Sequence, residues 1–161
     1  MIPKLARVMM VLAAAVLMLT VLATAQPKDP FVGTWTLNLA KSKYSPGPPP
    51  KSTTTAIEAA GKGYKVSVKT ESASGSAQEW AYTSNLDGKD APITGNNPNA
   101  DSLAVKRVDA NTLEVVYKKG GKVTTMQKSV VAADGKTRTV TTTGTDAQGQ
   151  KVNNVAVYEK S

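Results

Sequence analysis

The sequence predicts an all-β protein, an antiparallel up-and-down β-barrel of about 8–10 strands that follows an N-terminal signal peptide. Two observations support this fold class: short runs in which apolar and polar residues alternate, and turn residues between them at intervals of about ten to fourteen residues. Strands joined by such short loops run antiparallel, because a parallel neighbour needs a crossover of about a dozen residues or more. Closing the meander into a barrel removes its exposed edges.

The N-terminal segment has the features of a secretory signal peptide. Lys4 and Arg7 precede a charge-free apolar run over 8–23, and Ala23-Thr24-Ala25 supplies an A-x-A cleavage site. We therefore expect residues 1–25 to be removed and the protein to be exported to the periplasm or the extracellular space. The alternative is a retained anchor, for which the run is short beside the roughly 20 residues of a transmembrane helix.

The remaining residues, 26–161, have the length of one domain. The whole chain has a net charge of +8 and no cysteine, which predicts a cationic surface and a fold without disulfides. Because histidine is absent too, ordinary zinc, copper and haem sites and Ser-His or Cys-His nucleophiles are excluded. Most aspartates sit at turns, where they cap the backbone. We expect no enzyme activity, no cofactor, no metal and no nucleic-acid partner.

The first strand is predicted over Phe31 to Leu39. Gly33 beside the large indole of Trp35 suggests close backbone approach where this strand enters the barrel. A proline-rich loop follows at 40–51, since its prolines cannot donate hydrogen bonds to a β-ladder, and it is either a plain loop or a lid.

The later strands are separated by pairs such as Asp87-Gly88, Gly120-Gly121 and Asp134-Gly135, which supply the positive φ of tight hairpins. Tyr64, Val66 and Val68 alternate with lysines and so share one face. The predicted strands lie near 52–60, 63–71, 77–86, 90–94, 101–109, 112–118, 122–133, 136–144 and 150–159.

The predicted interior is lightly filled. The chain has one Phe, two Trp and five Tyr, while many strand positions hold Val, Thr, Ala and Ser. Small residues do not fill a barrel of about ten strands. Two arrangements follow from this composition: a barrel with a cavity, or a sandwich with a thin core.

Only two arginines, Arg107 and Arg138, follow the signal peptide. Arg107 shares strand parity with Leu103 and Val105, which turns its guanidinium inward unless a bulge sends it to solvent. An inward guanidinium matches a carboxylate. The parity of Arg138 with Val140 leaves its direction open. We therefore predict a ligand site whose four members are Trp80, Tyr82, Arg107 and Tyr117.

The Gly33-Thr34-Trp35 strand, the Lys41-Ser42-Lys43 segment and the run of hairpins resemble the lipocalin and fatty-acid-binding superfamily, in particular bacterial secreted lipocalin-like proteins. The resemblance implies that Gly33 and Trp35 close the barrel, with Arg138 or Lys151 as the basic partner of Trp35. It also implies carriage of a small hydrophobic ligand. The usual lipocalin disulfide and the other signature blocks have no counterpart here.

Two functions remain open at this level. The first is non-enzymatic binding, by a monomer, of a small hydrophobic or amphipathic ligand such as a lipid or a carboxylate inside the barrel. The alternative is a cationic surface module that binds an anionic face of the cell envelope and has no ligand cavity. The two differ in their response to salt, because exposed charges are screened beyond about 10 Å at 0.1 M.

Overall fold

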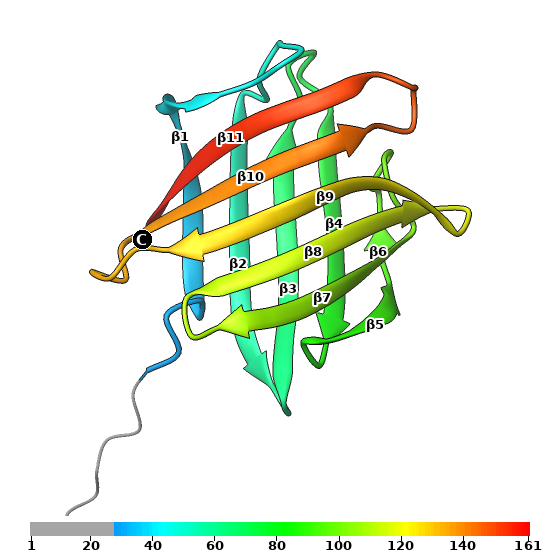
Figure 1. Cartoon of the computed structure of the whole chain (residues 1–161). Helices are drawn as coiled ribbons and strands as arrows, with labels where there is room; N and C mark the ends of the chain where they lie inside the picture. Colours follow the sequence, from blue (N-terminus) through cyan, green and yellow to red (C-terminus); the bar gives the residue numbers. More distant parts are fainter. Residues whose placement is uncertain (1–27) are drawn as a thin grey trace, which may run out of the picture.

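A computed structural model describes residues 28–161, so the predicted signal peptide lies outside the described residues. No helix within this range is long and apolar enough to cross a membrane. The described chain forms eleven strands (Figure 1): β1 (Gly33–Lys43), β2 (Ser52–Ala60), β3 (Gly63–Glu71), β4 (Ala77–Ser84), β5 (Asp87–Pro92), β6 (Thr94–Gly95), β7 (Ser102–Asp109), β8 (Thr112–Lys119), β9 (Lys122–Val131), β10 (Thr137–Thr145) and β11 (Lys151–Lys160).

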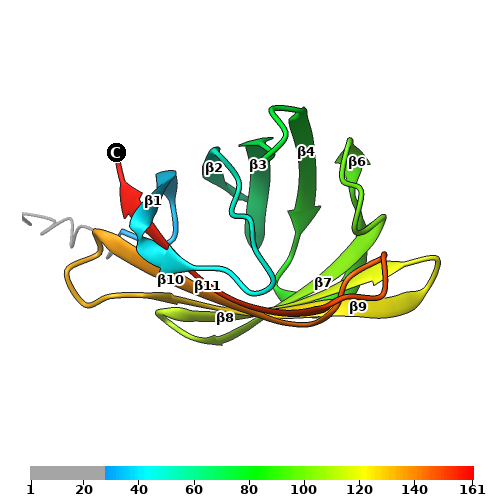
Figure 2. The same ribbon diagram turned by 90° about the horizontal axis from the view of Figure 1, so that it is seen from above.

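All eleven strands belong to one antiparallel sheet, in the order β5-β7-β8-β9-β10-β11-β1-β2-β3-β4-β6. Each strand from β7 to β11 pairs with the next along the chain, and β11 then pairs with β1, which continues into β2, β3 and β4. The sheet curves on itself, so that β7–β11 cross in front of β1–β4 (Figure 1), and a view from above shows these two walls facing each other (Figure 2). The predicted all-β up-and-down barrel is therefore confirmed.

The barrel is nearly closed, and the remaining opening lies between β4 and β7. The chain bridges it with two short strands: β5 pairs with β7, and β6 pairs with β4. Only Ile93 separates them, and its N–H donates to the carbonyl of Asp101 over 2.9 Å. The single strand predicted near 90–94 is thus two strands on opposite edges. Pro92 has no N–H with which to continue the ladder, so the chain leaves the β7 edge there.

Alternating side chains face the interior as the sequence predicts. Tyr64, Val66 and Val68 on β3 are buried, whereas Lys65 and Lys69 on the same strand are exposed. The side chains buried most completely gather at one end of the barrel and on the β7, β8 and β9 wall: Trp35, Phe31, Leu103, Val105 and Val131.

The N-terminal end of the first strand differs from the prediction. Phe31 lies in a turn before β1, and the strand begins only at Gly33, whose φ of +138° belongs to the left-handed region that favours glycine. A Cβ added to Gly33 would lie 3.4 Å from Cε of Lys160. This backbone turn packs the preceding segment, residues 29–32, against the core, where Phe31 is fully buried. We call this segment the plug. At its other end β1 continues to Lys43, so the proline-rich loop begins later than the predicted residue 40.

Candidate functional site

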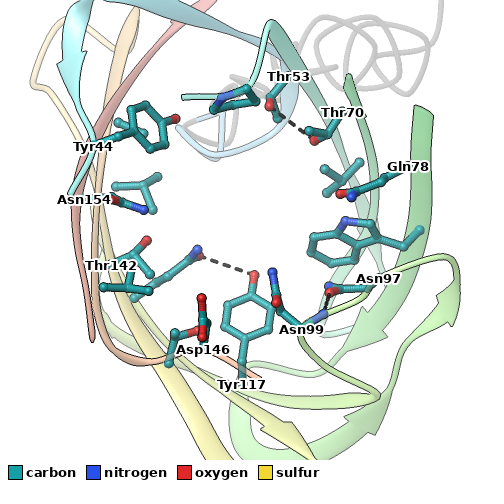
Figure 3. A pocket seen from close by; sticks show the side chains of 18 of the residues that line it. Tyr44, Thr53, Thr70, Gln78, Asn97, Asn99, Tyr117, Thr142, Asp146 and Asn154 are labelled. Carbon is teal, nitrogen blue, oxygen red and sulfur yellow. Dashed lines mark hydrogen bonds between the residues drawn. The ribbon is translucent and has the colours of Figure 1, made fainter. Parts of the chain in front are cut away.

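The two walls of the sheet enclose a cavity of about 380 Å³. Its mouth lies among the proline-rich loop, the loop that carries Asn97 and Asn99, and the turn at Asp146 (Figure 3). Side chains from both walls reach it, among them Thr70 of β3 and Thr142 of β10. The interior is therefore hollow, and the thin-core sandwich is wrong.

A second pocket of about 90 Å³ continues the cavity toward the closed end. The inner pocket has mostly aliphatic and aromatic walls, together with the guanidinium of Arg138. It connects with the outer cavity, because the two share six lining residues: Val68, Trp80, Tyr117, Gln127, Val140 and Tyr158.

Arg138 is the charged side chain of the inner pocket. On β10 it shares the inward face with Val140, and its side chain is 8% exposed. Its guanidinium carbon lies 4.6 Å from the ring centre of Tyr158 and 5.4 Å from that of Trp35. Within residues 28–161 it forms no salt bridge, and its buried Nε has no hydrogen-bond partner. The protein thus holds a buried positive charge that has two aromatic rings beside it and no described counterion.

Besides Tyr64, three tyrosines line the inner pocket with Arg138: Tyr82, Tyr117 and Tyr158. Burial raises the pKa of Tyr82 to about 12, and it also raises the pKa values of Tyr117 and Tyr158, while the charge of Arg138 opposes each shift. Burial lowers the pKa of Arg138, yet an arginine keeps its proton in proteins. At neutral pH the pocket therefore presents one cation and neutral phenols, which is chemistry suited to an anion.

Trp35 lies directly beneath this pocket and is 0% exposed. Its indole N–H donates to the carbonyl of Phe31 over 2.8 Å. Two cations lie close to the ring of Trp35: Nζ of Lys160 is 4.7 Å from its centre, and the guanidinium carbon of Arg138 is 5.4 Å from it. Lys160 also donates to the carbonyls of Pro30 and Val32. Trp35, the plug and Lys160 lie together at this end of the barrel, whereas Lys151 is exposed at the other end of β11.

Arg107 lies outside both pockets, which corrects its predicted place in the ligand site. It does point toward the same face as Leu103 and Val105, but near the end of β7. There its Nη2 donates to Asp29 over 2.8 Å and to the hydroxyl of Tyr64, which itself donates to Asp29 over 2.6 Å. Asp29 of the plug thus neutralises the charge of Arg107, and the guanidinium of Arg107 is already paired within the protein.

The other three predicted site residues do lie together. Trp80 and Tyr117 line both pockets, with ring centres 6.2 Å apart in an edge-to-face arrangement. Tyr82 lines the inner pocket and lies 6.0 Å from Trp80. The sequence prediction missed Tyr158 and left Arg138 undecided. Its signals for Arg138 were the parity with Val140 and the resemblance, which implied Arg138 or Lys151 as the basic partner of Trp35. Tyr158 carried no signal.

The described lining of the two pockets contains one carboxylate, Asp146 at the mouth. Its Oδ1 already accepts the backbone N–H groups of Gln148 and Gln150, at 3.0 and 2.8 Å. Across residues 28–161, no group of three or more His, Cys, Asp or Glu side chains is placed to hold a metal ion. The arrangement is suited to holding a small molecule in place.

No family model matches this chain, and no curated protein matches it in sequence. Among solved structures, it is similar to zebrafish ileal bile acid-binding protein complexed with cholic acid, at 15% sequence identity and a TM-score of 0.49. The match covers 82% of this chain and 99% of the zebrafish chain. Proteins this distant bind unrelated ligands, so the function of this chain has to follow from its own residues.

Proposed function

We propose that this protein binds a small amphipathic anion inside the barrel, and that Arg138 receives the acidic group. The observation that carries the proposal is the buried guanidinium without a described counterion. An uncompensated buried charge costs about 3–5 kcal/mol. Its cation–π contacts with Trp35 and Tyr158 return about 1–2 kcal/mol each, which leaves a deficit that a bound anion would remove.

The walls of the inner pocket support an amphipathic ligand over a simple anion. Ile57, Val66 and Leu113 offer aliphatic surface beside the guanidinium, and Trp80 and Tyr82 offer ring faces. At about 380 Å³ the outer cavity is at the low end of the roughly 300–1,000 Å³ typical of small-molecule sites. The proposed ligand is accordingly small, with an acid beside an apolar group.

Export and the absence of catalysis are parts of the same proposal. The N-terminal segment supports export of a monomeric carrier to the periplasm or the extracellular space. Binding without chemistry is supported by the single carboxylate of the described cavity lining, since glycoside hydrolysis, for example, uses a pair of them.

The test is a fluorescence titration of the mature protein with anilinonaphthalene sulfonate, an amphipathic anion, combined with native mass spectrometry for a co-purified ligand. Saturable binding is expected to weaken about ten- to a hundredfold in Arg138→Met, because a charge-assisted hydrogen bond contributes about 1.5–3 kcal/mol. Arg138→Lys keeps the charge but lacks the planar guanidinium, so its affinity should lie between those of the wild type and Arg138→Met. Arg107→Met is the matched control and should bind as the wild type does.

Two results would contradict the proposal: no saturable binding to the wild type, or equal affinity for wild type and Arg138→Met. The cationic-surface alternative has its own signature in the same titration. If surface lysines bind the anion, affinity should fall steeply as salt is raised and should not depend on Arg138.

A further inference from the structure

The outer cavity differs chemically from the inner pocket. Of its 22 lining residues, only seven have purely hydrocarbon side chains: Pro46, Pro48, Pro50, Val68, Val140, Val152 and Ala156. Amide, hydroxyl and phenol groups dominate the rest, and they surround the cavity from every side (Figure 3). An alkyl chain placed here would strip these polar groups of water and give them no partner, which is unfavourable.

Several of these polar groups have hydrogen-bonding capacity to offer a ligand. Gln78 on β4, Thr142 on β10 and Tyr44 in the proline-rich loop form no side-chain hydrogen bond with any residue in 28–161, and all three are half-buried. They approach the cavity from different directions (Figure 3). Others are already paired, as in the contact of 3.2 Å between the hydroxyls of Thr53 and Thr70.

Aromatic rings separate the two chemical zones. Trp80 and Tyr117 line both the outer cavity and the inner pocket, so a ligand that reaches Arg138 passes along their rings. Ring faces suit the apolar C–H face of a pyranose, while nearby amides and hydroxyls suit its hydroxyl groups. The order from the floor to the mouth is thus cation, apolar and aromatic walls, then polar groups that are neutral apart from Asp146.

We infer that, if the proposed function holds, the ligand is a polyhydroxylated acid of the glycoside class and not an alkyl-chain acid. Its acid and an adjoining apolar ring occupy the inner pocket at Arg138. Its hydroxyl-bearing ring occupies the outer cavity, where Gln78, Thr142 and Tyr44 hydrogen-bond to it. The inference rests on the proposed function for the position of the acid and extends it by assigning the outer part of the ligand.

Three probes of matched shape test it by isothermal titration calorimetry on the mature protein. The first, para-carboxyphenyl β-D-glucopyranoside, has both the acid and the sugar. The second, para-cyclohexyloxybenzoate, keeps the acid and a six-membered ring without hydroxyls. The third, phenyl β-D-glucopyranoside, keeps the sugar without the acid. We expect the first to bind at least about tenfold more tightly than either of the others, since each lacks one set of hydrogen bonds.

A pair of nearly isosteric variants on β10 provides the second readout. Thr142→Val removes a hydroxyl that lines the cavity, and the control Thr143→Val removes an exposed one that does not. Thr142→Val should weaken the carboxyphenyl glucoside about three- to tenfold and leave the cyclohexyloxybenzoate unchanged. The control should change neither. Gln78→Leu is a second variant with the same expectation, should Thr142→Val fold poorly.

The outcomes separate the two levels of the proposal. If para-cyclohexyloxybenzoate binds as tightly as the carboxyphenyl glucoside, and both depend on Arg138, the glycoside inference is overturned while anion binding stands. If Thr142→Val and Gln78→Leu bind the carboxyphenyl glucoside as the wild type does, the inference is overturned as well. If neither acid binds in an Arg138-dependent way, the proposed function itself fails, and the inference fails with it.

Discussion

Replacing Arg138 with methionine should stabilise the protein in the absence of ligand. The variant removes a charge that is 8% exposed and lacks a described counterion, and it keeps an unbranched side chain of similar length in the pocket. The desolvation cost of about 3–5 kcal/mol exceeds the two cation–π contacts, worth about 1–2 kcal/mol each. The expected gain in the free energy of unfolding is therefore about 1 kcal/mol.

The matched control is Arg107→Met, for which the same exchange should have the opposite sign. Side chains of Arg107 and Asp29 are 29% and 35% exposed, and their contact of 2.8 Å neutralises both charges. Removing Arg107 leaves Asp29 without its charged partner and the Tyr64 hydroxyl without a donor, at a cost of about 1–2 kcal/mol. The charge of Arg138 thus lowers the free energy of unfolding of the ligand-free protein, whereas the charge of Arg107 raises it.

Urea denaturation followed by circular dichroism, on ligand-free protein, measures both variants. Each kcal/mol should also move the thermal midpoint by about 3–5 °C for a domain of this size. Ligand must be removed first, since a bound anion would stabilise the wild type through Arg138 and hide the effect. A loss of stability in Arg138→Met equal to that in Arg107→Met would refute the reasoning, because it would show that the guanidinium of Arg138 is already satisfied.

Three further predictions address the closed end and the tyrosines. Trp35→Phe should lower the free energy of unfolding by about 1–2 kcal/mol, because the buried carbonyl of Phe31 loses its donor; an unchanged urea midpoint would contradict this. Stability should fall as pH rises from about 10 to about 12, because the pKa of Tyr82 is raised in the folded state and the protonated form is the one that folding favours. Tyr82→Phe should shift this alkaline transition upward in circular dichroism, and tyrosinate absorbance that develops fully before unfolding would argue against it. Gly33→Ala should destabilise by about 1–3 kcal/mol because of its φ of +138°, whereas Gly47→Ala, where an added Cβ meets no described atom within 4 Å, should be neutral in the same denaturation assay.

Local patterns in the sequence were enough to predict the strands and their inward faces. Alternation such as Tyr64, Val66 and Val68 is a local property, because successive side chains of a strand point to opposite sides whatever the strand pairs with. Hairpin turns such as Gly120-Gly121 are equally local, since they need only a positive φ, which both glycines have. The antiparallel barrel and three members of the cavity lining, Trp80, Tyr82 and Tyr117, followed from these patterns.

The difference between the two arginines depends on the folded barrel: Arg107 is paired with a carboxylate, and Arg138 has no described counterion. Strand parity predicted that Arg107 points inward, and it does. Its partner Asp29, however, is 78 residues away in the chain, so no local pattern could predict their contact. Arg138 and Tyr158 become partners through the register of β10 with β11, and Trp35 meets Lys160 through the register of β1 with β11. Registers between strands distant in sequence depend on how the whole sheet closes. Local patterns therefore predict which side chains face the interior, while the closed barrel determines which of them are neutralised and which remain available.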